Sequence, residues 1–307
     1  MSSLYTHQSQ NIWKTWLLMS VFFVVIILLG WFLSQYYGNP TILYGFFIFS
    51  IAMNIASYWY SDKLVLAMSG ARQAKREEFY DLYTVTENLA ITAGLPIPKI
   101  YVIHDPAPNA FATGRNKEHA VVCVTTGLLQ ILNRSELEGV MAHELSHIGN
   151  RDILLSTVVV VLVGFITLLA DFFFRSTFWG GQRNNREGGG QLGALLMILG
   201  IVFTILSPII ATLIQLAISR KREFLADASG ALLTRYPNAL ASALQKIAQS
   251  SRPMVRANHA TAHLFIANPF GRKQDGSVGF FTKIFSTHPP VAARVKASVE
   301  KGGKWRT

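Results

Sequence analysis

Four long apolar stretches without a lysine or an arginine divide this chain, and they constrain its fold more than any other feature. They cover residues 15–33, 41–60, 153–174 and 192–218. Each is close to or above the roughly 20 apolar residues that a helix needs to cross a bilayer. Half of the 307 residues are hydrophobic and only 15% are charged, which is an unusual balance for a soluble protein. We therefore expect an α-helical integral membrane protein with four apolar helices.

The residues at the ends of the first stretch support its interpretation as a membrane helix. Lys14 precedes it, and Trp16 and Trp31 lie near its ends, where aromatic residues mark a membrane interface. No small-residue cleavage site follows Gly30, so we expect an uncleaved anchor and not a signal peptide. The third and fourth stretches have an alternative interpretation as a buried hairpin in a soluble core. Their length and continuous apolar character favour the membrane.

The basic residues predict the orientation in the membrane. Of the 28 lysines and arginines, 24 fall within residues 61–152 and 219–307, and the loop 34–40 has none. By the positive-inside rule, both basic blocks face the cytoplasm. The segment 175–191 does not fit, because it has three arginines where an outside loop should have few. The third and fourth stretches could therefore also form a re-entrant hairpin.

The net charge of +11 raises the question of a nucleic-acid partner. The sequence contains no basic stripe with interleaved aromatic residues and no motif of a nucleic-acid-binding fold. Attraction to anionic lipid headgroups at the inner face explains the charge better. We expect the lipid bilayer as a partner and no nucleic acid.

The segment His143-Glu144-Leu145-Ser146-His147 has the pattern H-E-x-x-H on a predicted helix. A spacing of four residues brings both imidazoles to one face, where their nitrogens can converge on one zinc ion. Glu144 then projects toward the open side of the metal, where its carboxylate can take a proton from a bound water. Such a pattern arises by chance in roughly one chain in a hundred of this length, so its context matters.

The surroundings of this pattern predict a helix with one buried side. Ser135 and Glu138 have the spacing of a capping box at its start. Gly139 would allow a neighbouring element to approach closely. The apolar stripe consists of Leu137, Val140, Met141, Leu145 and Ile148.

A catalytic zinc ion needs a third protein ligand, and Glu223 is the best candidate. It lies on a second predicted helix with Asp227 one turn further on, from where Asp227 could accept a hydrogen bond from a ligand histidine. Alternatively, Glu223 pairs with Arg220 or Lys221 on a solvated helix face, and the spacing alone leaves both interpretations open.

A second pair of histidines, His259 and His263, is also separated by four residues. No glutamate follows the first of them, and the segment comes after a turn-like stretch with a proline. We expect this pair to be structural.

Five motifs occur along the chain. They are N-A-F-A-T-G (109–114), H-E-L-S-H-I-G-N (143–150), R-E-F-L-A-D (222–227), H-L-F-I-A-N-P (263–269) and H-P-P-V-A-A-R (288–294). Together, in this order, they resemble the HtpX-type membrane zinc metalloproteases, a family related to the CAAX prenyl endopeptidases. The resemblance spans the chain from the first apolar stretch to the last predicted helix. It implies that Glu223 is the third ligand of one Zn²⁺ per chain, beside His143 and His147.

The resemblance also implies roles outside the metal ligands. It implies that His288 and Arg294 steady the oxyanion of the tetrahedral intermediate. Independently of the resemblance, we expect Asp227 and Asn150 to support the ligands. An edge strand is expected to bind extended peptides through backbone groups that every substrate has. Its residues are Asn109, Ala110, Phe111, Ala112, Thr113 and Gly114. On the sequence alone, residues 109–114 would be a turn and a strand, and His288 and Arg294 surface residues.

These features predict a mainly helical, zincin-like protease domain that carries a small β-sheet and is split by a membrane hairpin. Residues 1–62 would hold the first two membrane helices, 63–152 the first part of the protease domain, 153–218 the hairpin, and 219–307 the second part. We expect an amphipathic helix over residues 71–92, and strands at 99–104, 110–113 and 120–125.

The predicted function is that of a zinc-dependent endopeptidase in a bacterial inner membrane, with its active site facing the cytoplasm. It would degrade misfolded or damaged membrane proteins in quality control and stress response, and a homo-oligomer is compatible with the sequence. One alternative is a dedicated prenyl-peptide protease, which would cut only near a lipidated C-terminal cysteine. Another is a non-catalytic, zinc-stabilised membrane adaptor or holdase, which would have no peptidase activity.

Overall fold

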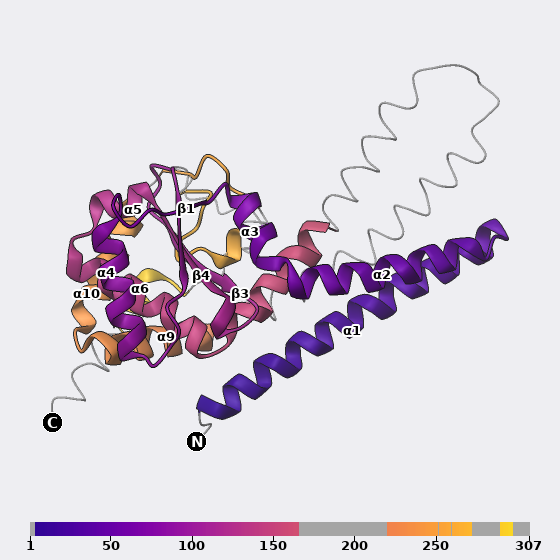
Figure 1. Cartoon of the computed structure of the whole chain (residues 1–307), viewed down its shortest axis with the longest axis horizontal. Helices are drawn as coiled ribbons and strands as arrows, with labels where there is room; N and C mark the ends of the chain where they lie inside the picture. The colour runs from indigo at the N-terminus through magenta and orange to yellow at the C-terminus, as the bar shows by residue number, and fades with distance from the viewer. Residues whose placement is uncertain (1–3, 166–219, 251, 259, 272–288, 297–307) are drawn as a thin grey trace, which may run out of the picture.

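The computed structural model describes residues 4–165, 220–250, 252–258, 260–271 and 289–296. A globular part carries two long helices that extend away from it (Figure 1). These are α1 (Leu4–Tyr37) and α2 (Thr41–Trp59), which run side by side in opposite directions. Gly38 between them has a φ of 62°, a conformation that glycine adopts without strain. The fold is thus a membrane-type helical hairpin joined to a globular domain.

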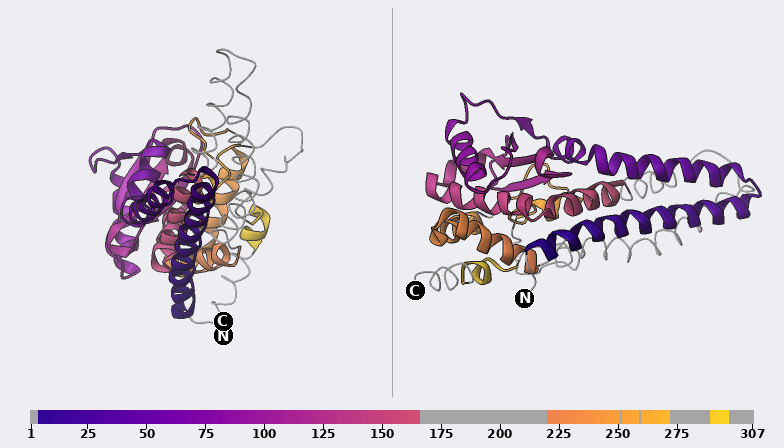
Figure 2. Two further views of the ribbon diagram at one scale, coloured as in Figure 1. Left: turned by 90° about the vertical axis from the view of Figure 1, so that its right-hand side faces the viewer. Right: turned by 60° about the horizontal axis from the view of Figure 1, so that its bottom comes forward.

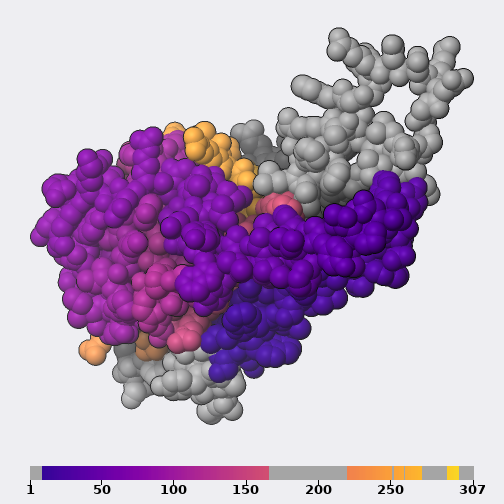
Figure 3. All heavy atoms as spheres, turned by 45° about the vertical axis from the view of Figure 1, so that its right-hand side comes forward, coloured from indigo at the N-terminus to yellow at the C-terminus, as the bar shows by residue number. Residues whose placement is uncertain are grey.

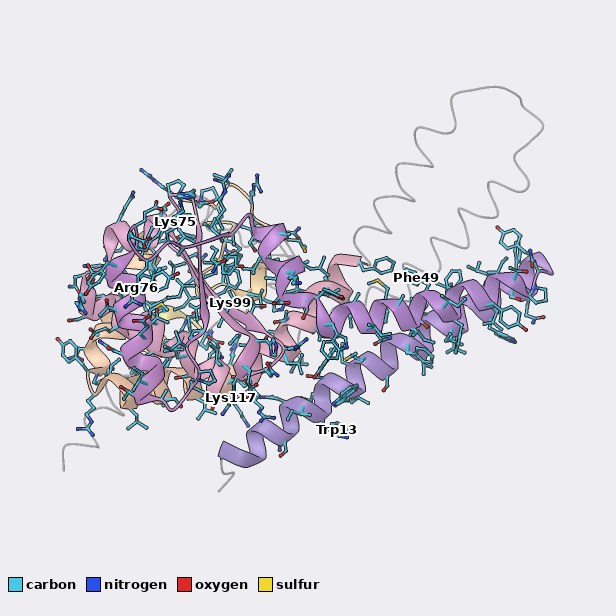
Figure 4. The ribbon with its side chains drawn as sticks, viewed as in Figure 1. Trp13, Phe49, Lys75, Arg76, Lys99 and Lys117 are labelled. Atoms are coloured by element: carbon cyan, nitrogen blue, oxygen red, sulfur yellow. The ribbon has the colours of Figure 1, made fainter. Side chains whose placement is uncertain are left out.

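The residues Ser9–Tyr37 and Thr41–Trp59 are each long and apolar enough to cross a membrane. This agrees with the first two predicted membrane helices, although α1 begins well before residue 15. The two helices project from the globular part in a space-filling view (Figure 3), and the labelled Trp13 and Phe49 lie on them (Figure 4). Large apolar side chains are exposed on both, as a lipid environment requires. They include Trp13, Trp16, Leu17, Val24, Leu28, Trp31, Phe47, Ile48, Ile51 and Ile55.

The third predicted apolar stretch begins as a helix, Asp152–Phe165, which follows the H-E-x-x-H helix after a bend of 85°. Val158, Val159 and Leu162 in it are fully buried. If the two bent helices count as one span, the described residues contain up to three spans. The rest of the third stretch and all of the fourth lie outside the described residues. Four apolar helices were predicted, and two of them are seen in full.

A mixed four-stranded sheet with the order β1-β2-β4-β3 lies at the centre of the globular part. Its strands are β1 (Arg72–Gln73), β2 (Lys99–Ile103), β3 (Ala110–Gly114) and β4 (Ala120–Thr125). The inner pair β2 and β4 is parallel, and both outer strands are antiparallel to their neighbours. The predicted strands agree with β2, β3 and β4, and β3 is an edge strand, as the resemblance implied.

The prediction of one helix over residues 71–92 was wrong in its first part. Helix α4 begins only at Tyr80 and ends at Thr92, and Arg72 and Gln73 form β1 instead. The Ala74 N–H donates to the Ile100 carbonyl at 3.0 Å, which continues the pairing with β2. Pairing with a distant strand therefore overrides the local helix propensity of this segment.

Alternate residues of β4 face two different apolar clusters, as the period of a strand requires. Val122 and Val124 face one of them, here called the first cluster. Val121 and Cys123 face the other, the second cluster. The first cluster is formed with helices α4, α6 (Arg134–Gly149) and α10 (Pro237–Gln249). Both faces of the small sheet are therefore covered.

The second cluster joins the globular part to the membrane helices. Leu18, Phe22 and Ile26 of α1 belong to it, together with Phe111 of β3 and residues of the helix Asp152–Phe165. Helix α3 (Ser61–Ser69), which follows α2 directly, contributes Val65 and Leu66 to it. Two further views show α1 passing along the globular part before it extends outward (Figure 2). The anchor and the sheet thus share one core.

Helix α6 carries the H-E-x-x-H motif, and its start differs from the prediction by two residues. The capping box consists of Asn133 and Glu136, not of Ser135 and Glu138. Gly139 allows the close approach that the sequence predicted, because a Cβ atom there would lie 2.6 Å from the Leu240 nitrogen of α10.

The remaining elements are α5 (Thr126–Ile131), α9 (Arg220–Thr234) and the 3₁₀ turns η1 (Lys117–His119) and η2 (Ala262–Leu264).

Candidate metal centre

Three side chains from two helices meet at one point inside the globular part. His143 and His147 come from α6, and Glu223 comes from the first turn of α9. The two Nε2 atoms lie 3.2 Å apart. The Glu223 carboxylate oxygens lie 3.8 Å from His143 Nε2 and 3.5 Å from His147 Nε2. Among the described residues, these three form a group whose ligand atoms all lie within 4.8 Å of one another, close enough to hold one metal ion.

Close packing of α9 against α6 explains why Glu223 reaches the histidines. A Cβ atom at Gly230 would lie 3.1 Å from the His143 nitrogen, so this glycine lets the two helices approach. Gly230 follows Glu223 by seven residues, or nearly two helical turns, and Asp227 lies between them on the same face. All three residues therefore face α6.

Asp227 and Arg294 fix the orientation of the His143 ring. His143 Nδ1 lies 2.9 Å from Asp227 Oδ1, which places the ring proton on Nδ1 and leaves Nε2 as the metal-facing nitrogen. Arg294 donates from Nε and Nη2 to the two Asp227 oxygens at 2.9 and 2.6 Å. Its Nη2 also lies 3.3 Å from His143 Nε2.

The charges in this group keep His143 ready to bind a metal. Burial opposes ionisation of Asp227, but the Arg294 guanidinium and the His143 contact outweigh it and lower the pKa of Asp227 to about 2. Burial and the nearby Arg294 lower the pKa of His143 to about 4, despite the Asp227 contact. His143 is therefore neutral at pH 7, as a metal ligand must be.

His147 is held by a different carboxylate, that of Asp152 just beyond the end of α6. His147 Nδ1 lies 3.0 Å from Asp152 Oδ2, so its Nε2 also points to the shared position. Burial acts to lower the pKa of His147, but the Asp152 hydrogen bond and the Glu223 and Glu144 carboxylates raise it to about 9. Three carboxylates thus stabilise positive charge around this imidazole, and a divalent cation would satisfy the same field.

Glu144 lies beside this group and is only 2% exposed. Its negative charge helps to raise the pKa of His147. It also adds to the effect of burial, which raises the pKa of the Cys123 thiol well above its ordinary value. The second residue of the motif is therefore close to the metal-binding position.

Other residues expected at the site have different surroundings. Asn150 caps the end of α6, and its main-chain oxygen accepts a hydrogen bond from the Asn11 side chain. Within the described residues, Asn150 Nδ2 has no hydrogen-bond partner. His263 lies apart from the metal group, with its Nε2 3.1 Å from the Ser156 carbonyl oxygen. His288 and His259 lie outside the described residues.

The expected substrate strand, β3, contacts α6, the helix that carries the H-E-x-x-H motif. Asn109 connects its start to the segment after η2, because its Oδ1 accepts from Ala267 N–H at 3.1 Å and its Nδ2 donates to the Ala267 carbonyl at 3.0 Å. The Ala110 carbonyl accepts from Ile266 N–H at 2.9 Å, on the side away from β4. Gly114 N–H donates to Thr157 Oγ1 at 3.4 Å. Ala112, between them, directs its backbone groups to the same outer edge.

Sequence reasoning missed three residues around the site. Asp152 contacts His147, but a carboxylate five residues after that histidine has no spacing typical of a known motif. Arg222 and Asn11 are both buried, and Arg222 Nη1 donates to Asn11 Oδ1 at 3.3 Å. Asn11 comes from a helix 132 residues before the motif, so no local pattern could have found it.

Comparison with known proteins matches residues 76–301 to peptidase family M48. The Protease HtpX homolog of Caldanaerobacter subterraneus subsp. tengcongensis is 46% identical over 297 residues, which is 96% of each chain. That of Thermoanaerobacter pseudethanolicus is 47% identical over 96% of each chain. That of Thermococcus kodakarensis is 46% identical over 92% of this chain and 94% of the relative. The crystal structure of S. mikatae Ste24p aligns with a TM-score of 0.49 at 18% identity, over 93% of this chain and 66% of that one.

Proposed function

The chain belongs to peptidase family M48 and is a membrane metalloprotease, and we propose that it is a zinc-dependent endopeptidase that degrades misfolded or damaged membrane proteins. One observation carries this proposal. Two imidazole nitrogens and one carboxylate converge beside Glu144, in a domain whose core is shared with a membrane-length helix. The relatives compared above carry the name of a protease, which is consistent with it.

The donor set fits zinc. Two imidazoles and one carboxylate are a known ligand set of catalytic zinc, and three protein ligands leave a coordination position open. Each ligand histidine has its second nitrogen held by an aspartate, as is common around zinc. When bound, zinc supplies a Lewis acid that lowers the pKa of a water molecule and polarises the scissile carbonyl. His143, His147 and Glu223 would hold it.

The chain's own residues would then perform the proton transfers and fix the geometry. Glu144 would accept a proton from the attacking water and donate it to the leaving amine. Asp227 would hold His143, and Asp152 would hold His147. We assign Arg294 a positioning role, because two of its donors bind Asp227 and its Nη1 lies 3.8 Å from Glu223 Oε2. Asp227 uses only two of the five N–H donors of the guanidinium, so the oxyanion role that the resemblance implies stays a prediction beside the positioning role.

The edge strand β3 would bind substrate in an extended form. Ile266 already bonds to the Ala110 carbonyl and Thr157 to the Gly114 N–H, so a substrate strand would pair at Ala112 between them. Main-chain pairing accepts many sequences, which suits a protease of unfolded segments. The position of β3 along α6 would bring the peptide next to the metal.

We also propose that the metal site faces the cytoplasm of a bacterial inner membrane. Figure 4 places the labelled Lys75, Arg76, Lys99 and Lys117 on the globular part. The Arg115 guanidinium lies 4.3 Å from the centre of the Trp59 ring at the end of α2, a position suited to a membrane interface. The positive-inside rule supports a cytoplasmic globular part.

The test compares the wild type with E144Q, both purified in detergent with a chelator and then supplied with zinc. We expect the wild type to cut casein, 1,10-phenanthroline to stop it, and E144Q to retain zinc while cleavage falls by about 10² to 10⁴. Cleavage by E144Q at the wild-type rate would contradict the assigned mechanism. Cutting confined to lipidated C-terminal peptides would favour the prenyl-peptide protease. Bound zinc without any cleavage would favour the adaptor.

A further inference from the structure

Asn11 connects the membrane anchor to the metal centre. It lies near the beginning of the span Ser9–Tyr37, yet it is only 4% exposed. Its Nδ2 donates to Asp152 Oδ1 at 2.5 Å and to the Asn150 carbonyl at 3.4 Å. Its Oδ1 accepts from Arg222 Nη1 at 3.3 Å. One amide from α1 therefore contacts the segment after α6 and the first turn of α9.

Two of these partners, Asp152 and Arg222, adjoin the proposed metal ligands. Asp152 uses its other oxygen, Oδ2, to hold His147 Nδ1 at 3.0 Å. Arg222 directly precedes Glu223, and both the Asp152 and the Glu223 carboxylates counter the lowering of the Arg222 pKa by burial. Asn11 is thus linked to two of the three proposed ligands, to His147 through Asp152 and to Glu223 through Arg222.

The direction of the Asn11 amide follows from the chemistry of its partners. Asp152 Oδ1 and the Asn150 carbonyl only accept hydrogen bonds, and the Arg222 guanidinium only donates them. Reversing the amide would place its oxygen against two acceptors and its NH₂ group against a donor. A side chain at position 11 must therefore offer a donor on one side and an acceptor on the other. Thr15 Oγ1, one turn later, donates to the Asn11 carbonyl at 2.9 Å and is also buried.

We propose that Asn11 is a positioning residue of the metal site, and that correct placement of the N-terminal end of α1 is a condition for tight metal binding. The inference rests on the proposed function, since it takes His143, His147 and Glu223 as zinc ligands. Asn11 orients Asp152, and Asp152 orients His147. Loss of an outer partner of a ligand histidine commonly weakens metal affinity by about 10 to 100-fold.

The experiment measures zinc affinity in the full-length chain, in detergent, by competition with a fluorescent chelator. Every variant is made in the E144Q background, so that self-cleavage does not interfere. N11A removes both halves of the amide, and N11D is isosteric but places an acceptor against Asp152. We expect the zinc Kd to rise by about 10-fold or more in N11A, and by more in N11D. N54A is the matched control, because within the described residues Asn54 on α2 donates to the Ser50 carbonyl and to no other group. The zinc Kd of N54A should stay within about twofold of that of the E144Q parent.

A double-mutant cycle with D152N shows whether the effect passes through Asp152. The amide installed at position 152 can donate to the carboxylate installed at position 11 and still accept from His147. We therefore expect N11D/D152N to lose less affinity than the product of the two single losses. A double loss equal to that product or larger overturns the proposal, and so does parent-like affinity in both N11A and N11D. If N11A does not purify as a folded protein, the zinc affinity of N11D and the double-mutant cycle still test the proposal.

Zinc binding by the E144Q parent distinguishes a failure of the proposed function from a failure of the role proposed for Asn11. If E144Q itself binds no zinc, or if H147A leaves its zinc binding unchanged, the proposed function fails. If the parent binds zinc through His147 and the Asn11 variants bind it equally well, only the role of Asn11 fails.

Discussion

Arg294 and Asp227 form a two-point ion pair inside the protein, with N–O distances of 2.6 and 2.9 Å, and the carboxylate of that pair holds His143, a proposed metal ligand. Arg294 is 1% exposed, so water cannot replace either partner. The pair joins the helical segment 291–296 to α9, and through His143 to α6. The last residue of a late motif therefore fixes the orientation of a histidine 151 residues earlier.

Replacement of Arg294 should damage both stability and metal binding. R294A leaves the Asp227 carboxylate buried without its cation, which typically costs about 3 to 5 kcal/mol in the free energy of unfolding. R294K keeps the charge but cannot donate two parallel hydrogen bonds, so we expect an intermediate loss. Thermal unfolding in detergent and zinc competition would measure both effects. A wild-type zinc Kd in R294A would contradict the link from Arg294 to His143.

Asp152 should matter for the metal although it is not a ligand. D152A removes the acceptor for His147 Nδ1, and we expect the zinc Kd to rise by about 10 to 100-fold. D152N keeps an acceptor and should lose less. Unchanged zinc affinity in D152A would show that His147 needs no support from this side. D81A is a suitable control, because Asp81 forms an exposed ion pair with Arg134 far from the site.

Metal removal should destabilise the folded chain. Without a cation, the carboxylates of Glu223, Glu144 and Asp152 remain crowded around His147. A ligand present at 100 times its Kd stabilises the native state by about 2.7 kcal/mol, so zinc should raise the unfolding temperature measurably. The measurement is thermal unfolding of E144Q with chelator and with excess zinc. The same comparison in E144Q/H147A should show a much smaller shift, and a shift of full size would contradict the ligand assignment.

Close helix packing at Gly139 predicts a steric effect. In G139A the added Cβ would lie 2.6 Å from the Leu240 nitrogen and 2.9 Å from its Cα, so α10 must move. Overpacking of this kind typically costs about 1 to 3 kcal/mol in the free energy of unfolding. G149A on the same helix is the control, because among the described residues the nearest atom to its Cβ would be Leu95 Cδ1, at 4.0 Å. Equal unfolding temperatures in the two variants would contradict the packing described between α6 and α10.

Glu136 should make the stability of the α6–α10 contact depend on pH. Burial opposes its ionisation, but hydrogen bonds from Lys246, Ser242 and the Asn133 N–H outweigh this and lower the pKa of Glu136 below its ordinary value. A carboxyl whose pKa is lowered on folding stabilises the native state above its unfolded pKa and stops doing so as the pH falls through the folded value. In metal-free protein, E136Q should therefore show a smaller loss of unfolding temperature between pH 6 and pH 3, while still serving the capping box. Parallel pH profiles would contradict this.

The sequence predicted the parts of the site that depend on local periodicity. Two histidines four residues apart must share a helix face, and Asp227 must share the face of Glu223 one turn away. The prediction that α9 packs against α6 depended on the family resemblance. The spacing of Glu223 alone does not exclude a solvated position for this residue. Asp152 and Asn11 could not be predicted, because their roles arise from a bend after α6 and from the packing of α1.

The fold shows the same division between local and long-range effects. The long apolar runs identified α1 and α2, because length and composition alone decide whether a helix can span a membrane. Two overlapping capping boxes fit the start of α6, and the chain uses the one formed by Asn133 and Glu136. The order of strands in the sheet, and the replacement of a predicted helix by β1, depend on pairing between distant segments.

The apolar cluster that contains Leu18, Phe22 and Phe111 has a practical consequence for anyone who would trim this protein. A truncated fragment that starts after the second long helix would lose side chains that fill its own interior and would leave one side of the sheet uncovered. Such a fragment should aggregate or bind detergent in place of the missing helix. The enzyme and its anchor are thus one folding unit, and crystallisation or inhibitor screening calls for the intact polypeptide in a lipid-like medium.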